Sequence, residues 1–160
     1  MQRRSLLIGA ASLLGATHIA ARAATPAAAP TALPVMQVWK DPNCGCCKDW
    51  IAYLQRDGFQ VQVFETGNTA MRQRLGMPQK FASCHTALIG GYVIEGHVNA
   101  TEIRRLLAEK PKALGLSVPG MPVGSPGVDG PEYGGRKDPY DVVLVMPDGS
   151  GRPYRSYFRT

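Results

Sequence analysis

The chain has 160 residues, of which 44% are hydrophobic and 8% aromatic, which is enough for one domain with one apolar core. The first 23 residues carry three of the 18 basic residues and none of the 12 acidic ones, so without them 15 basic residues face 12 acidic ones and the net charge falls from +6 to +3. No basic stripe interleaved with aromatic residues is present, and the arginines suit solvated helix faces: Arg72, Arg74, Arg104 and Arg105. The composition therefore excludes a nucleic-acid-binding role.

Residues 1–23 have the form of a signal peptide: a basic start, MQRR, precedes an apolar run, and the segment ends in Ala-Arg-Ala at Ala23. The apolar run is shorter than the roughly 20 residues that a membrane span needs, so we expect no membrane insertion of the mature chain. The paired arginines also match a twin-arginine export signal, and both export routes stay open. Either route predicts a periplasmic protein cleaved near Ala23.

A linker and a folded domain follow this leader. Residues 24–34 are rich in Ala and Pro without a period, which predicts a flexible linker. The folded domain is expected over residues 35–160. It opens with a predicted strand, 35–41, and a predicted helix, 46–58, with one apolar face made of Trp50, Ile51 and Leu54.

The middle of the domain continues this alternation of strands and helices. Residues 59–66 alternate apolar and polar side chains, which predicts a strand, and residues 68–76 predict a short helix capped by one of its first two residues. Residues 86–98 predict two strands joined by a Gly-Gly turn, and residues 99–110 a helix. The order β-α-β-α-β-β-α predicts a small α/β sandwich of the thioredoxin type.

The C-terminal third differs in composition. Residues 113–139 are too dense in Gly and Pro for regular elements, and an ordered wrap and a mobile loop both stay open. Residues 140–158 predict a closing hairpin. The fold class is therefore α/β, a thioredoxin-like sandwich with a Gly/Pro-rich C-terminal extension and a closing hairpin.

Four cysteines carry the candidate chemistry: Cys44, Cys46, Cys47 and Cys84. Two structural disulfides would be the default in an oxidising compartment. Cys46 and Cys47 are adjacent, however, and a bridge from Cys44 to Cys46 would close a very small ring. A purely structural pair of bridges is therefore disfavoured.

The spacing C-G-C-C fits two kinds of chemistry. Cys44 and Cys47 form a C-x-x-C pair at the start of the first predicted helix, where the helix dipole lowers thiol pKa values and favours thiolates for both thiol exchange and metal capture. A dithiol oxidoreductase needs only two sulfurs, whereas Cu(I) gains from a third, Cys46. Zinc prefers two separated C-x2-C pairs, so a zinc-stabilised structural module is disfavoured.

Further candidate ligands lie later in the chain. In a thioredoxin-type fold the loop before the third strand packs against the start of the first helix, so Cys84 would complete a four-thiol cluster. His85, beside it, is a candidate ligand or a donor that orients one, and His97 is another candidate. Met121 lies in a Gly/Pro segment without a helix face to fill, and we expect its thioether to approach the metal.

Three stretches, "DPNCGCCKDW", "ASCHTALIGGYVIEGHV" and "GLSVPGMPVGSPG", resemble the CopG-type family of periplasmic copper-resistance proteins, over about Val35 to Tyr140. The resemblance implies a thioredoxin-like fold in which the four cysteine thiols bind copper, with a role in copper redox handling or detoxification. The first stretch also resembles the thioredoxin motif C-G-P-C-K. It departs from that motif at Asn43, where a tryptophan is usual, and the proline that normally precedes the third strand is absent, which favours metal binding.

The first hypothesis is a periplasmic copper-binding protein that holds Cu(I) on Cys44, Cys46, Cys47 and Cys84, with one or several ions, in exchange with other periplasmic copper-handling proteins. The alternative is a thiol–disulfide oxidoreductase or metal-site reductase, with Cys44 as the nucleophile and Cys47 as the resolving thiol. Enzymatic turnover stays open in both.

Overall fold

The structure is a computed structural model that describes residues 32–159. The predicted signal peptide, 1–23, and residues 24–31 of the predicted linker lie outside the described residues. Leu33, near the end of that linker, packs against the core of the domain.

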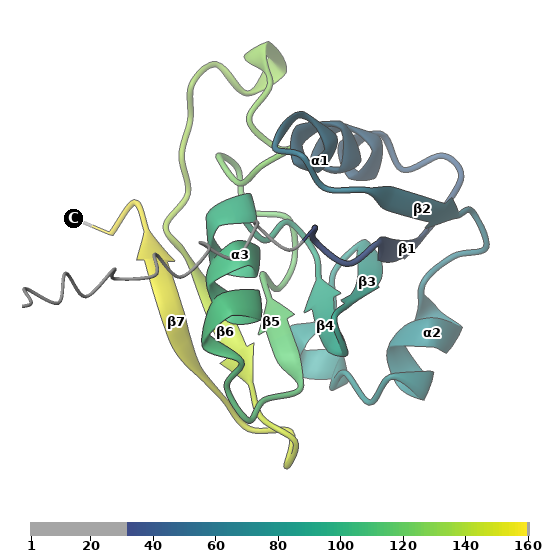
Figure 1. The fold of residues 1–160 in the computed structure, drawn as a ribbon. Coiled ribbons are helices and arrows are strands. Elements are labelled where there is room, and N and C mark those ends of the chain that lie inside the picture. Colours follow the sequence, from purple (N-terminus) through teal and green to yellow (C-terminus); the bar gives the residue numbers. More distant parts are fainter. Residues whose placement is uncertain (1–31, 160) are drawn as a thin grey trace, which may run out of the picture. The chain divides into compact units, whose positions relative to one another are not determined.

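Seven strands of the described residues form one sheet in the order β2-β1-β3-β4-β5-β6-β7 (Figure 1). Neighbouring strands are antiparallel except for β1 with β2 and β4 with β5. The bounds of the strands are β1 Met36–Lys40, β2 Val61–Phe64, β3 His85–Ile89, β4 Tyr92–Glu95, β5 Gly115–Ser117, β6 Tyr140–Val145 and β7 Gly151–Tyr157.

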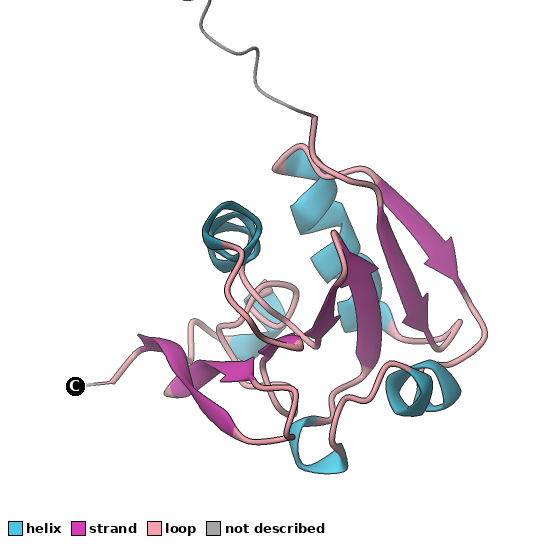
Figure 2. Cartoon of the chain, turned by 60° about the horizontal axis from the view of Figure 1, so that its bottom comes forward, coloured by secondary structure: helices cyan, strands magenta, loops and turns pink. Residues whose placement is uncertain are grey.

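The helices lie on both sides of this sheet, with α1 and α3 on one side and α2 on the other (Figure 2). Their bounds are α1 Gly45–Arg56, α2 Thr69–Arg74 and α3 Ala100–Glu109, with short 3-10 helices at Gln79–Phe81 and Pro131–Tyr133. None of the helices in residues 32–159 has the length and apolar character to cross a membrane.

The main core forms between the sheet and the apolar faces of α1 and α3. Trp50 and Leu54 of α1 and Ile103 and Leu106 of α3 are fully buried in it. Strand residues alternate between this core and a smaller cluster on the other face. In β4, for example, Ile94 joins the main core and its neighbour Val93 joins the smaller cluster.

The mixed α/β class and the order β-α-β-α-β-β-α are confirmed, and the thioredoxin-like assignment stays a prediction. The closing hairpin is present as β6 and β7. The prediction that the Gly/Pro-rich segment lacks regular elements is wrong, because β5 pairs there with β4. Gly115 allows this pairing, since a Cβ at this position would overlap the backbone of Val93.

Candidate metal centre

The cysteine-rich turn begins α1. Cys44 is the residue before the first helical position, and its N–H donates to the carbonyl of Asp41 at 3.1 Å. The Asp41 carboxylate also accepts from the Asn43 N–H at 2.8 Å, which closes the turn. The first turn of α1 has no acidic residue and no side-chain cap. The positive end of the helix dipole is therefore left for the cysteine sulfurs.

Cys44 and Cys47 form a disulfide, the pair that the C-x-x-C spacing selects. Cys47 is fully buried and Cys44 is partly exposed. The other two cysteines of the described residues, Cys46 and Cys84, are free thiols.

Cys46 lies at the centre of the sulfur cluster. Its Sγ is 3.6 Å from the Sγ of Cys44, 3.9 Å from that of Cys84, and 3.6 Å from the Sδ of Met121. All four cysteine sulfurs lie within 4.8 Å of one another. The expectation that the loop before the third strand would bring Cys84 to the start of α1 agrees with this geometry.

His97 faces Cys84 from the other side. Its Nε2 is 3.1 Å from the Sγ of Cys84, and its Nδ1 is 2.8 Å from the carbonyl oxygen of Pro126. Because a carbonyl can only accept, Nδ1 carries the proton and Nε2 presents a lone pair to the sulfur. Burial lowers the pKa of His97, which keeps the ring neutral.

The thiol of Cys84 is held in its protonated form. Burial, followed by the neighbouring Cys46, raises the pKa of Cys84 to about 12. The Cys84 thiol therefore donates its proton to the lone pair of His97. A soft cation that binds here would displace this proton.

His85 is the first residue of β3 and is fully buried. Its ring centroid lies 4.2 Å from that of Trp50, and its Nδ1 is 3.5 Å from the Sγ of Cys84. Its Nε2 has no hydrogen-bond partner among the described residues. Burial lowers the pKa of His85 well below its ordinary value, so this ring is neutral too. Cys84, His85 and His97 thus form a second group with ligand-atom spacing.

Met121 and the Gly/Pro-rich segment lie over the cysteine turn. Met121 is 53% exposed, although its Sδ contacts Cys46. Further along, Gly127 lies so close to α1 that an added Cβ would be 2.7 Å from both the Cys46 carbonyl oxygen and the Trp50 nitrogen. Of the two alternatives for this segment, the structure shows the ordered wrap.

The sequence reasoning missed a buried polar cluster beneath the Cys84 loop. Arg72, expected on a solvated helix face, is only 6% exposed and pairs with the fully buried Glu95 at 3.4 Å. Asn68 is the N-cap residue of α2, but its side chain makes no capping bond and reaches the Ser83 carbonyl instead. The glutamate at the end of the apolar strand "YVIE", Glu95, was the one available signal.

The chain is similar to known proteins in both sequence and fold. A family described as "Protein of unknown function, DUF411" matches residues 81–128, and no curated protein matches the chain. Two solved structures of a "Copper resistance protein copG", forms 1 and 2, are each 43% identical to this chain, with a TM-score of 0.71. Each alignment covers 78% of this chain and 98% of the other. This chain belongs to the CopG family.

In this CopG-family chain the DUF411 match contains the second group of ligand-type side chains and Met121, but stops short of the cysteine turn of α1. The alignment with the two CopG structures covers most of the chain. The CopG resemblance of the three sequence stretches is therefore confirmed.

Proposed function

We propose that this protein binds Cu(I) in the periplasm on the thiolates of Cys44, Cys46, Cys47 and Cys84, in copper resistance or homeostasis. The observation that carries the proposal is the placement of four cysteine sulfurs within 4.8 Å of one another. Thiolates and thioethers are the soft ligands that Cu(I) selects. Met121, whose Sδ contacts Cys46, and the lone pair of His97 add soft and borderline donors on two sides.

The redox state of the cysteines sets how many thiolates are available. The bridge between Cys44 and Cys47 must take up two electrons from a reductant, which breaks the S–S bond, before both sulfurs can bind as thiolates. We therefore propose that the reduced protein is the form that holds the full copper load. Cys46 contacts sulfurs on both sides, which favours bridging between ions and thus a site with more than one Cu(I).

The predicted signal peptide, 1–23, would export the chain, and the relatives of known structure are named copper resistance proteins. Copper ions would then be the cargo, exchanged with other periplasmic copper-handling proteins.

A second candidate function is thiol–disulfide exchange, and the Cys44–Cys47 bridge is the observation that favours it. A substrate dithiol would attack Cys44, the partly exposed sulfur, and release the Cys47 thiolate; the substrate would leave oxidised and the protein reduced. This reaction uses neither Cys46 nor Cys84. The contacts that these two cysteines make with Met121 and His97 favour copper binding.

Cys46→Ser separates the two functions. The mature protein is reduced without oxygen and titrated with Cu(I) against a chelator of known affinity, and its exchange activity is measured with a model disulfide. Copper binding predicts more than one Cu(I) per wild-type chain and a clear drop in Cys46→Ser. Cys47→Ser is the matched control, because it removes one thiolate of the copper site and also one of the two cysteines needed for exchange; it should lower both Cu(I) binding and exchange activity. A wild-type protein without Cu(I) affinity, and exchange activity that survives in Cys46→Ser, would overturn the proposal.

A further inference from the structure

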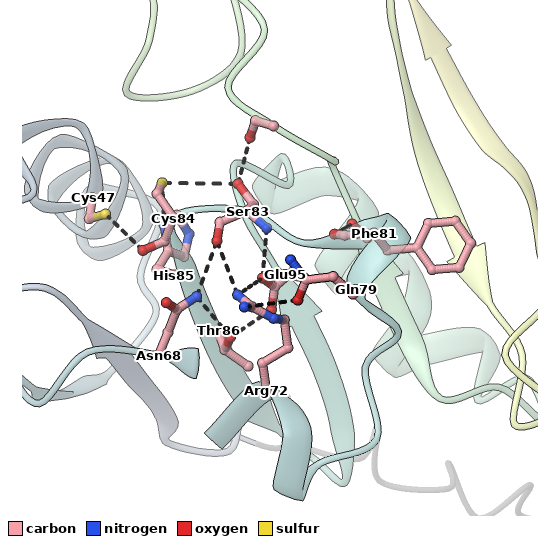
Figure 3. Close-up of polar contacts among 12 residues, drawn as sticks. Cys47, Asn68, Arg72, Gln79, Phe81, Ser83, Cys84, His85, Thr86 and Glu95 are labelled. Carbon is pink, nitrogen blue, oxygen red and sulfur yellow. Dashed lines mark hydrogen bonds and ion pairs between the residues drawn. The ribbon is translucent and has the colours of Figure 1, made fainter. Parts of the chain in front are cut away.

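A buried polar cluster lies directly beneath the loop that carries Cys84 (Figure 3). Glu95 of β4 and Thr86 of β3 are fully buried, and Arg72 of α2 is 6% exposed. Asn68, just before α2, completes the cluster. The hydrogen bonds of these four side chains lead to one another, to the backbone of Ser83 and, from Arg72, to the side chain of Gln79.

The cluster forms hydrogen bonds with both backbone polar groups of Ser83, its N–H and its carbonyl oxygen. The Ser83 N–H donates to Oε1 of Glu95 at 2.8 Å. Its carbonyl oxygen accepts from the side-chain amide of Asn68 at 3.2 Å and from the Arg72 guanidinium at 3.4 Å. The other carboxylate oxygen of Glu95 accepts from the Thr86 hydroxyl at 2.6 Å, which fixes the carboxylate in turn. The residue before Cys84 is therefore held through both of the peptide units that flank its Cα.

Ser83 also holds the loop that carries Met121. Its hydroxyl donates to the carbonyl oxygen of Gly120 at 2.5 Å, and Gly120 directly precedes Met121. Gly96 makes the arrangement possible, because a Cβ there would overlap both the Ser83 side chain and the Val118 carbonyl. Ser83 thus links the loop of Cys84 to the loop of Met121, and both of these side chains contact Cys46.

A buried ion pair contributes little to stability by itself, because desolvation offsets most of the attraction between the charges. An apolar pair would fill the same space, but it would offer the Ser83 peptide neither an acceptor nor a donor. The contacts of Glu95 and Arg72 therefore serve the geometry of the loop.

We propose that Glu95, Arg72 and Asn68 are positioning residues that act through Ser83 and set the distances of Cys84 and Met121 from Cys46. This inference rests on the proposed copper function for its effect on binding, but the loop geometry itself is testable without metal. Loss of the Ser83 contacts would let Cys84 move away from Cys46 and His97.

The decisive pair of variants is Glu95→Leu and Glu95→Gln. Leu removes the acceptor of the Ser83 N–H at similar volume, whereas Gln keeps an amide oxygen for that bond and a donor for the Thr86 hydroxyl. In the metal-free protein with the added change Cys46→Ser and the bridge intact, Cys84 is the one free thiol. Glu95→Leu removes the three hydrogen bonds that the carboxylate accepts, so alkylation of Cys84 should be at least about tenfold faster in Glu95→Leu and should return to the wild-type rate in Glu95→Gln.

The copper measurement uses the same two substitutions with all four cysteines present and reduced. Glu95→Leu should weaken Cu(I) binding by about tenfold and change the ultraviolet Cu–thiolate absorption, with Glu95→Gln close to wild type. Leu106→Ala, in the core on α3, is the stability control, and it should lower stability while leaving the alkylation rate and Cu(I) affinity unchanged. If Glu95→Leu does not fold, Asn68→Ala replaces it, with an expected increase in alkylation of about threefold from the loss of its one hydrogen bond to Ser83.

Three results would overturn the inference: an unchanged alkylation rate in Glu95→Leu or its substitute, no rescue by Glu95→Gln, or an equal effect of Leu106→Ala. If the wild-type protein binds no Cu(I) but the alkylation rates follow the expected order, the proposed function fails while the positioning role of the cluster stands.

Discussion

Gly127 lets the Gly/Pro-rich segment lie against the first turns of α1, so Gly127→Ala should loosen this contact. The residue has φ of +83°, and an added Cβ would be 2.7 Å from the Cys46 carbonyl oxygen and from the Trp50 nitrogen. Both of these are backbone atoms of a helix and cannot move aside. The segment itself must shift, and with it the neighbouring Pro126 carbonyl that accepts from His97.

The structure sets the size of the expected effect. A left-handed conformation costs an alanine about 1–2 kcal/mol. Forcing a methyl group into a closely packed contact costs a further 1–3 kcal/mol, roughly. The free energy of unfolding should therefore fall by about 2–5 kcal/mol in Gly127→Ala. Gly135 is the matched control, because its φ is +76° and nothing lies within 4 Å of its Cβ position; Gly135→Ala should cost only the conformational part.

Urea unfolding of the metal-free protein measures both variants. With a denaturant dependence of about 1.5 kcal/mol per molar, the midpoint should fall by roughly 1.5–3 M in Gly127→Ala and by about 1 M in Gly135→Ala. Equal shifts in the two variants would refute the reasoning, because they would mean that the segment does not pack on α1.

Three further predictions follow from individual contacts. Trp50→Phe, which leaves a buried carbonyl without its indole donor, should lower the free energy of unfolding by about 2–4 kcal/mol in urea titrations. Burial lowers the pKa values of His85 and His97 in the folded metal-free protein below the ordinary histidine value of 6.5. Below pH 6.5, these two histidines therefore take up protons in the unfolded chain but not in the folded one. Stability should therefore fall on acidification below that pH by up to about 1.4 kcal/mol per pH unit for each histidine. Glu95, whose pKa is raised, offsets at most one of the two, and unfolding midpoints that stay level from pH 7.5 to 5.5 would contradict the neutral assignment. Met121→Leu, at a half-exposed position, should change stability by less than about 0.5 kcal/mol but weaken Cu(I) binding by up to about tenfold in chelator competition.

The chain order of the first seven elements was readable from local patterns. The apolar face of α1 and the Gly-Gly turn between β3 and β4 are properties of short stretches, and the structure contains both, together with the predicted strand β2. The C-x-x-C spacing likewise selected Cys44 and Cys47, which are bridged. Such patterns repeat every two to four residues, so they can be recognised in the sequence without knowing which other segments of the chain pack against them.

The short strand β5 and the side-chain role of Asn68 were misjudged because local rules were applied where distant contacts decide. Gly115 weighs against a strand by propensity, yet the close approach of β4 requires it. Asn68 has the side chain of a helix cap, but the Ser83 carbonyl, brought near by the fold, takes its amide.

The sequence by itself determined that this is an α/β domain with a sulfur-rich turn at the start of its first helix, and it named every sulfur now found there. Tertiary structure alone decided that His97 would face Cys84 across 13 residues of chain, that Met121 would reach Cys46 across 75, and that Arg72 would be buried with Glu95 rather than solvated. A charged side chain looks the same in the sequence on a surface and in an interior. Only the packing of β3, β4 and α2 removes water from Arg72 and Glu95, and that removal gives their contacts with Ser83 their role in the geometry of the site.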